Sequence, residues 1–171
     1  MKKITLPITE KDISNLKVGE KVLLSGTIYS CRDQAHKRIF NLIKENKPLP
    51  FDLKNACVYY AGPCPTPEGK VTNSFGPTTS TRMDAFTPTL LDLGLKVMIG
   101  KGKRSQEVID SIAKNKCLYF SAIGGAGAIY GNAVKSMEII AFPELLSEAV
   151  RRVEIVDFPV ILYIDSNGNS L

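Results

Sequence analysis

Segments typical of β-strands alternate with segments typical of α-helices through the middle of the chain, and this alternation most limits the possible fold. The apolar, β-branched run KVLLSGTIYS (21–30) leads into CRDQAHKRIFNLIKENK (31–47), where apolar residues recur at helical spacing. ACVYYAG (56–62) predicts a second buried strand, and LKVMIG (95–100) predicts a third. We therefore expect an α/β domain with a mixed central sheet flanked by helices.

Capping residues mark the helices that lie between these strands. Thr81 and Asp84 have the spacing of a capping box, which predicts that a helix begins there. Thr87 followed by Pro88 predicts a second cap with proline at the first helical position. Gly94 predicts the end of that helix.

The last third of the chain continues the pattern with further helices and strands. The predicted elements are a helix in SQEVIDSIAKN (105–115) capped by Ser105, a strand in CLYFSAIGG (117–125), a short helix in PELLSEAV (143–150), and a final strand pair, RRVEIVDFP (151–159) with VILYIDSNGN (160–169), around a turn.

Length and composition indicate one ordinary globular domain covering residues 1–171. The chain is 44% hydrophobic and 23% charged. It has no run of about eighteen apolar residues, so we expect no membrane-spanning segment. Its start, MKKITLPITEKD, lacks the apolar core of a signal peptide, which favours a cytoplasmic location.

The charge balance favours anionic partners only weakly. Lys and Arg number 22 against 17 Asp and Glu, for a formal net charge of +5. The basic residues are scattered and no basic run is interleaved with aromatic residues, so we expect no nucleic-acid binding.

The four cysteines do not have the spacing of a metal site. Cys31, Cys57, Cys64 and Cys117 include no CxxC pair, which argues against a zinc ribbon or a self-contained iron–sulfur site. Without a secretion signal, disulfides are not expected either, and we predict reduced, mostly buried thiols.

Three cations lie where predicted strands end or helices begin. Arg32 follows the strand 21–30, Lys101 follows the strand 95–100, and Arg82 opens the helix after GPTTST. Ligands of α/β sheets collect at such points, so the three cations predict an anion pocket, although each alone is typical of a solvated surface charge. Arginine forks pair with carboxylates through two hydrogen bonds, so two forks and one ammonium favour a small dicarboxylate held at both ends. Phosphate is the open alternative, although no phosphate-loop spelling is present.

Other candidate residues have simple structural alternatives. His36 lies one helical turn after Arg32 and faces the same space, or it is a capping or partly buried polar side chain. Thr78 and Thr79 belong to NSFGPTTSTRMD (73–84) and on their own are typical loop or capping hydroxyls. A threonine hydroxyl is a poor base unless a neighbour or cofactor changes its state. Gly125, within GGAGAIYG (124–131), permits close backbone approach to a ligand or a tight turn.

Six blocks in order along the chain resemble the β part of class I fumarate hydratases, a family that includes the L-tartrate dehydratase β subunit. The blocks are SCRDQAHKR, YYAGP, GPTTSTRMDAFTP, IGKGKRS, AIGGAGA and VEIVDFPVILYIDSNGNS. This resemblance implies a swivelling β/β/α domain and reversible hydration of fumarate to (S)-malate.

The resemblance also assigns roles to residues of the predicted pocket. It implies that Arg32 and Arg82 anchor substrate carboxylates, that Thr78 is the proposed catalytic base, and that Lys101 is a pocket lysine. The remaining residues that it places around the substrate are His36, as pocket support, Thr79 and Gly125.

The family also implies a partner and a cofactor. A separate α subunit is expected to carry a [4Fe–4S] cluster, in an α2β2-type assembly, while this chain alone binds no cofactor. Two alternatives remain open: dehydration of L-tartrate to oxaloacetate, and a stand-alone anion-binding module.

Overall fold

One mixed β-sheet and a set of short helices make up the described residues of this computed structural model, which are 1–63, 75–122 and 132–171. The strands are β1 (Lys2–Thr5), β2 (Lys21–Ser30), β3 (Cys57–Tyr59), β4 (Val97–Gly100), β5 (Leu118–Ser121), β6 (Val134–Ala141) and β7 (Val150–Ile164). The α-helices are α1 (Glu10–Asn15), α2 (Asp33–Lys44), α3 (Thr87–Asp92) and α4 (Gln106–Asn115), and the 3-10 helices are η1 (Ser80–Met83) and η2 (Pro143–Glu148). The mixed α/β class predicted from the alternation of segments is confirmed.

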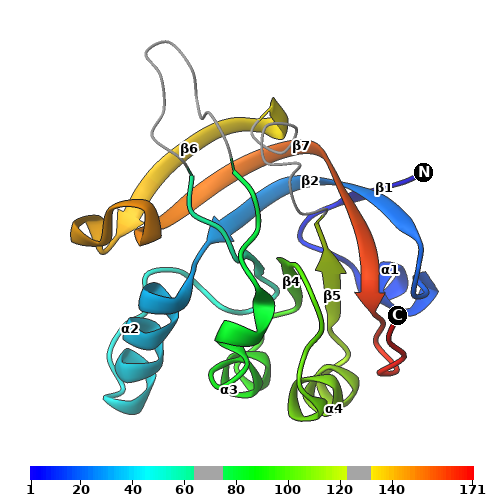
Figure 1. Ribbon diagram of the computed structural model, residues 1–171, viewed down its shortest axis with the longest axis horizontal. Coiled ribbons are helices and arrows are strands. Elements are labelled where there is room, and N and C mark those ends of the chain that lie inside the picture. The colour runs from blue at the N-terminus through cyan, green and yellow to red at the C-terminus, as the bar shows by residue number, and fades with distance from the viewer. Residues whose placement is uncertain (64–74, 123–131) are drawn as a thin grey trace.

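The long strand β7 closes part of the sheet into a barrel. The strand order is β1-β2-β3-β4-β5-β7-β6, and β2 also pairs with β7. Strands β1 to β5 run parallel to their neighbours, whereas β7 runs antiparallel to β2, β5 and β6. Strands β2, β3, β4, β5 and β7 therefore form a closed ring. In Figure 1, β6 and β7 arch above strands β4 and β5.

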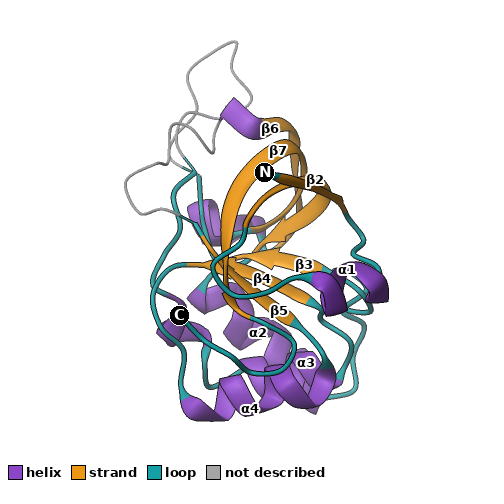
Figure 2. Cartoon of the chain, turned by 90° about the vertical axis from the view of Figure 1, so that its right-hand side faces the viewer, coloured by secondary structure: helices purple, strands orange, loops and turns teal. Residues whose placement is uncertain are grey.

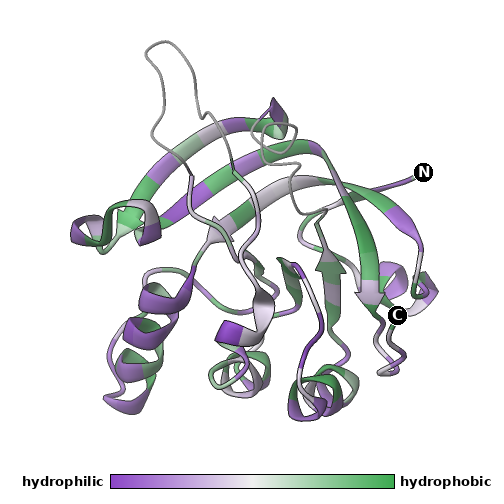
Figure 3. Cartoon of the chain, viewed as in Figure 1, coloured by the Kyte–Doolittle hydropathy of each residue, from purple (hydrophilic) through white to green (hydrophobic). Residues whose placement is uncertain are grey.

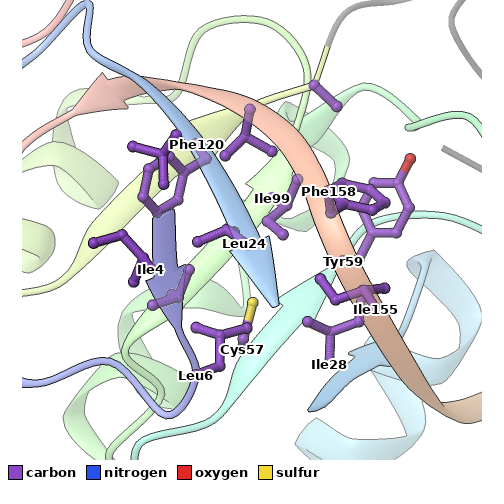
Figure 4. Close-up of a cluster of buried hydrophobic side chains, with 14 of the residues drawn as sticks. Ile4, Leu6, Leu24, Ile28, Cys57, Tyr59, Ile99, Phe120, Ile155 and Phe158 are labelled. Carbon is purple, nitrogen blue, oxygen red and sulfur yellow. The ribbon is translucent and has the colours of Figure 1, made fainter. Parts of the chain in front are cut away.

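Alternate side chains of the ring point into the barrel and form one core. Successive residues of a strand face opposite sides of the sheet, so Tyr59 of β3 packs inside the barrel and Val58 packs outside it. Figure 4 shows the interior, where the labelled side chains are Ile4, Leu6, Leu24, Ile28, Cys57, Tyr59, Ile99, Phe120, Ile155 and Phe158. Ile4 of β1 also enters this core, together with Leu6 and Ile8 just after the strand, so the strand outside the ring contributes to the core.

Helices α2, α3 and α4 cover the outer face of β3, β4 and β5. Their buried apolar residues form a second core with the outward-facing residues of those strands, such as Val58 and Met98. Figure 2 shows the three layers: β2, β6 and β7 above, β3 to β5 in the middle, and the helices below. Helices therefore cover only the outer face of β3, β4 and β5. The inner face of these strands lines the barrel. The exposed surface of α2 is mostly hydrophilic (Figure 3).

In the described ranges, no helix combines the length and the apolar character that a membrane crossing requires.

The predicted strand pair in 151–159 and 160–169 is wrong, because residues 150–164 form the single strand β7. One edge of β7 pairs with β2 along most of its length. On the other edge, β6 pairs with residues 150–155 and β5 with residues 161–164. Pro159 falls between these two partners, so its missing N–H leaves the ladders on that edge intact. The turn lies later, where Asp165 accepts hydrogen bonds from the backbone of Asn167 and Asn169.

Strands β1 and β6 and helix α1 were not predicted from the sequence, and one predicted helix is of a different type. Strands β1 and β6 were not predicted, because most of their residues are exposed or only partly buried and they lack a strong apolar signal. The predicted helix 143–150 is the 3-10 segment η2, interrupted at Leu146 with φ 56° and ψ −116°. Two boundary predictions are confirmed: Ser105 caps α4, and Gly94, with φ +114°, follows the end of α3.

Candidate functional site

The carboxyl ends of four parallel strands meet at one edge of the sheet. Arg32 comes just after β2, Gly62 after β3, Lys101 directly after β4 and Ala122 directly after β5. Parallel pairing of these strands brings Arg32 and Lys101 to the same edge, as their positions in the sequence predicted.

The segment that contains Thr78 is attached to the end of β3. The Tyr59 hydroxyl donates a hydrogen bond to the carbonyl of Phe75, which is fully buried. The Thr78 amide donates to the carbonyl of Tyr60 at 2.7 Å, and Pro77 forms a bridge with Ala61. The backbone of the segment is therefore an extension of the sheet.

The same segment is attached to the end of β4 by its next residues. Thr79 forms a parallel bridge with Lys101, and the Ser80 amide donates to the Lys101 carbonyl at 3.0 Å. A Cβ atom on Gly100 would overlap Ser80 Oγ and would lie 2.7 Å from the Tyr60 ring. Only glycine at position 100 permits this close approach, which places the two threonines beside Lys101.

Thr78 and Thr79 present their side chains at this edge. Thr78 is partly exposed and Thr79 is exposed. The Thr78 hydroxyl has no hydrogen-bond partner among the residues that the structure describes, and Thr79, at the N-cap of η1, makes no side-chain capping bond. As far as the described residues extend, both hydroxyls are available to a ligand.

Arg82 lies in the 3-10 helix η1 and reaches toward α2. Its side chain is 56% exposed, and Nη1 lies 3.8 Å from Asp33 Oδ2. Such an exposed, long ion pair contributes little to stability, so most of the guanidinium's hydrogen-bonding capacity is free for a ligand.

The predicted capping box at Thr81 and Asp84 is wrong. The Asp84 carboxylate instead accepts from Arg104 Nε at 2.7 Å and from the Ser105 amide at 2.8 Å. The second predicted helix start is confirmed to within one residue: α3 begins at Thr87, with Pro88 in its first turn. Thr87 is not the cap, since Phe86 is the N-cap and the Thr87 hydroxyl donates to the carbonyl of Met83. Asp84 does not form the predicted capping box because a hydrogen bond from the charged Arg104, twenty residues away, is stronger than one from a nearby backbone amide.

Unpartnered buried polar atoms concentrate at the ends of β2 and β3. Among the described residues, the buried side-chain atoms without a hydrogen bond are Ser30 Oγ, Arg32 Nε, Asp33 Oδ1 and Tyr60 Oη. Buried polar atoms in folded proteins are almost always paired, so four of them in this part of the chain indicate a place that a polar ligand or partner completes.

Arg32 occupies the N-cap position of α2 without making a side-chain capping bond. Its Nε lies 4.0 Å from Glu148 Oε1, too far for a hydrogen bond, while the same carboxylate oxygen accepts from the Gln34 amide at 3.2 Å. Gly62 lets the chain around Ser147 pack closely here, because a Cβ on Gly62 would overlap the Ser147 carbonyl. The guanidinium is thus held at the edge, and its Nε makes no hydrogen bond within the described ranges.

His36 supports the turn that carries Arg32. It is 1% exposed, and its Nδ1 lies 2.9 Å from the Arg32 carbonyl and 3.3 Å from Cys31 Sγ. Burial lowers the pKa of His36 to about 4, so the ring is neutral at pH 7. Since a carbonyl can only accept, Nδ1 carries the proton and donates to Arg32. His36 therefore acts on the edge through the backbone of Arg32, not through a solvent-facing contact.

The described cysteines are structural thiols. Cys31, Cys57 and Cys117 are buried and free. Burial raises the pKa of each thiol, to about 11 for Cys117, so none is a reactive thiolate at neutral pH. No group of three His, Cys, Asp or Glu residues that could hold a metal occurs in the described ranges. Cys64 and Gly125 lie outside the described residues.

Arg104 and Asp84 are the residues at this edge that the sequence analysis missed. Arg104 lies in the quoted motif IGKGKRS, where spacing gave it no role, and Asp84 lies in GPTTSTRMDAFTP, where spacing predicted only a helix cap. The Arg104 side chain is fully buried, and a buried arginine in a loop beside a candidate anion pocket is visible only in three dimensions.

Comparisons with known proteins relate the chain to one family. The family described as Fumarase C-terminus matches residues 1–171. The chain is 39% identical over 163 residues to fumarate hydratase 2 of Leishmania major, covering 94% of this chain and 29% of that protein. It is 40% identical over 159 residues to the anaerobic class I fumarate hydratase of Escherichia coli strain K12, covering 92% and 29%. It is 33% identical over 177 residues to the L(+)-tartrate dehydratase subunit beta of the same strain, covering 100% and 87%.

The chain thus spans less than a third of the length of these fumarate hydratases. It spans most of the length of the tartrate dehydratase subunit.

The lowered pKa of His36 predicts a pH-dependent stability. Between pH 6.5 and about 4 the unfolded chain binds a proton that the folded chain excludes, so the free energy of unfolding falls as the pH falls. From pH 7 to pH 5 this loss is about 2 kcal/mol. Urea unfolding followed by circular dichroism, at both pH values, measures it.

His36→Gln is the matched control, because a glutamine amide can still donate to the Arg32 carbonyl but does not titrate. We expect the difference between pH 7 and pH 5 to shrink by about 2 kcal/mol in this variant. An equal difference in both proteins would show that His36 titrates normally in the fold.

Proposed function

The chain belongs to the Fumarase C-terminus family, and we propose that it is the β subunit of a two-chain hydro-lyase that interconverts fumarate and (S)-malate. The relatives named above are hydro-lyases, either fumarate hydratases or tartrate dehydratases. The observation that carries the proposal is the convergence of Arg32, Lys101 and the Thr78 segment at one edge, where some buried polar atoms have no hydrogen-bond partner among the described residues.

The substrate class follows from the cations at this edge. Arg32 and Arg82 each offer a planar fork that pairs with a carboxylate through two hydrogen bonds, and Lys101 adds a point charge. Arg82 is largely exposed and Arg32 Nε has no hydrogen-bond partner among the described residues, so both have capacity left for a ligand. We infer that the site holds a small dicarboxylate at both of its ends.

Thr78 is the residue of this chain that we propose removes the proton from the substrate carbon. Its amide is fixed to the Tyr60 carbonyl, so the position of the side chain is set by the sheet. A free threonine hydroxyl is too weakly acidic to serve as a base, so we propose that Lys101 and the bound substrate's surroundings favour its deprotonated form. Thr79 and Gly125 are proposed to line the pocket around it.

The rest of the active site is proposed to come from an α subunit. This chain corresponds to 29% of each fumarate hydratase that it matches, and its tartrate dehydratase relative is named a subunit beta. We propose that the α subunit carries a [4Fe–4S] cluster, since no residue group in the described part of this chain fits a metal. When bound, such a cluster supplies a Lewis acid for the substrate hydroxyl.

We further propose that this domain is of the swivelling β/β/α type and closes over the cluster-bearing subunit in an α2β2-type assembly. The layered arrangement of two β layers and one helical layer supports this proposal (Figure 2). The cations at the edge would then enclose the substrate between the two chains.

A second candidate is dehydration of L-tartrate to oxaloacetate. The match to the tartrate dehydratase subunit spans 87% of that protein, a correspondence in length that the fumarate hydratases do not show. Both substrates are small dicarboxylates, so the three cations suit either one.

Anaerobic co-expression with the longer partner chain, followed by spectrophotometric assays on malate, fumarate and tartrate enantiomers, tests the proposal. We expect reversible conversion of malate to fumarate by the pair. Turnover of tartrate alone would replace the first candidate with the second. No turnover of any of them would leave the chain as an anion-binding module. The chain alone is expected to be folded, free of iron and inactive.

Replacing Arg82 by lysine in the assembled enzyme is expected to impair it strongly. Lysine keeps the charge but loses the fork, so kcat/KM should fall roughly 30- to 1000-fold. Steady-state kinetics on malate measure this change. Arg152→Lys is the matched control, because Arg152 is also an exposed arginine but lies on β7. This variant should change kcat/KM less than about twofold. A loss below about threefold for Arg82→Lys would mark it as a surface charge.

Thr78→Ala is expected to lower kcat far more than it raises KM. Binding depends mainly on Arg32, Arg82 and Lys101, whereas a general base contributes on the order of 100- to 10,000-fold to the rate. Thr78→Ser should retain more activity, because it keeps the hydroxyl.

Thr79→Ala is the neighbouring control for this prediction, and its kcat should stay close to normal. If Thr79→Ala abolishes turnover while Thr78→Ala does not, the proposed roles of the two threonines are reversed. If neither variant changes kcat, the base lies on the partner chain.

A further inference from the structure

Arg104 is the most completely buried charge beside the proposed substrate site. Its side chain is 0% exposed, and Nε donates to Asp84 Oδ1 at 2.7 Å. Nη2 donates to Thr87 Oγ1 at 2.9 Å, and Nη1 lies 3.6 Å from Met98 Sδ. A buried guanidinium is costly unless its hydrogen bonds are satisfied, so this set of partners holds it in one position.

Two tyrosine rings complete the surroundings of the guanidinium. The Arg104 Cζ atom lies 5.1 Å from the ring centre of Tyr60 and 4.8 Å from that of Tyr119, within the range of cation–π contacts. Both tyrosines also contact the two segments that carry the proposed substrate residues, 75–84 and 101–105, which we call the substrate segments. The Tyr60 carbonyl accepts from the Thr78 amide. The Tyr119 hydroxyl oxygen lies 2.7 Å from Ser80 Oγ and 2.7 Å from the Gly102 carbonyl.

Asp84 provides the second link between the two substrate segments. One carboxylate oxygen binds Arg104 Nε, and the other accepts from the Ser105 amide at 2.8 Å. Asp84 lies two positions after Arg82, and Arg104 lies three positions after Lys101. The buried pair of Asp84 and Arg104 therefore connects the segment that follows Arg82 to the segment that follows Lys101.

We propose that Arg104 is a positioning residue of the site, which holds Arg82, Lys101 and Thr78 in the mutual arrangement that a dicarboxylate requires. Arg104 is too deeply buried to touch the substrate, so it acts through Asp84, Tyr60 and Tyr119. The identity of the ligand in this inference rests on the proposed function, but the coupling of the two segments does not.

Arg104→Lys tests the proposal because it changes the shape of the group and keeps its charge. An ammonium can pair with Asp84, but it cannot also donate to Thr87 in the same plane and lie flat against both rings. Lys103→Met is the matched control, because Lys103 is the exposed neighbour in the same loop.

Amide hydrogen exchange of the full chain gives a readout that needs no activity. In Arg104→Lys we expect the Thr78 and Ser80 amides, which bond to Tyr60 and Lys101, to exchange at least tenfold faster. Amides of the β2–β7 ladder should be unchanged, as should all amides in Lys103→Met. Faster exchange confined to residues 104–105, or equal acceleration throughout the chain, would overturn the proposal.

Kinetics of the assembled enzyme give the second readout. At a temperature where Arg104→Lys is fully folded, kcat/KM for the preferred dicarboxylate should fall at least tenfold, with Lys103→Met unchanged. A variant with a lower Tm but normal kcat/KM would show that Arg104 serves stability alone. If the wild-type pair turns over no dicarboxylate, the proposed function fails, and hydrogen exchange still decides whether Arg104 couples the segments.

Thr87→Val is a milder variant in case Arg104→Lys does not fold. It removes one acceptor of the guanidinium while keeping the shape of the side chain. We expect the same amides to exchange faster, by a smaller factor. No change at Thr78 and Ser80 in this variant would contradict the proposal.

Discussion

The pairing of β7 with both β2 and β5 is the constraint on which the rest of the structure depends. It closes five strands into a barrel, and the closure fixes the order and direction of β2, β3, β4 and β5. Because these four strands are parallel, everything that follows each of them emerges at one edge. The substrate site that we propose is a consequence of this geometry, since its residues come from segments far apart in the sequence.

Backbone hydrogen bonds then give that edge its precision. The segment from Phe75 to Ser80 is hydrogen-bonded to the ends of both β3 and β4, so backbone hydrogen bonds place Thr78 beside Lys101. Next to this segment lies the buried ion pair in which Arg104 donates a hydrogen bond to the Asp84 carboxylate. In the described part of the chain, the buried polar atoms without a hydrogen bond lie at the ends of β2 and β3, where we propose that the ligand binds.

The sequence predicted those parts that depend on local patterns. Helix α2, strands β2, β3 and β4, the Ser105 cap and the end of α3 before Gly94 follow from periodicity and capping, which nearby residues determine. Arg32 and Lys101 were found because their positions after strands carry topological information. The single strand β7 and the true partners of Asp84 could not be predicted. They depend on contacts with residues distant in the chain, and these contacts override the local turn and capping signals. Arg104 resembled one more loop cation until its burial was known.

A crystal structure of the chain assembled with its partner and bound to malate tests the central claim most directly. We expect the two carboxylates of the ligand to lie within hydrogen-bonding distance of Arg32, Arg82 and Lys101, with the Thr78 hydroxyl facing the carbon that loses its proton. A dicarboxylate bound away from this edge, with these cations still exposed to solvent, would contradict it.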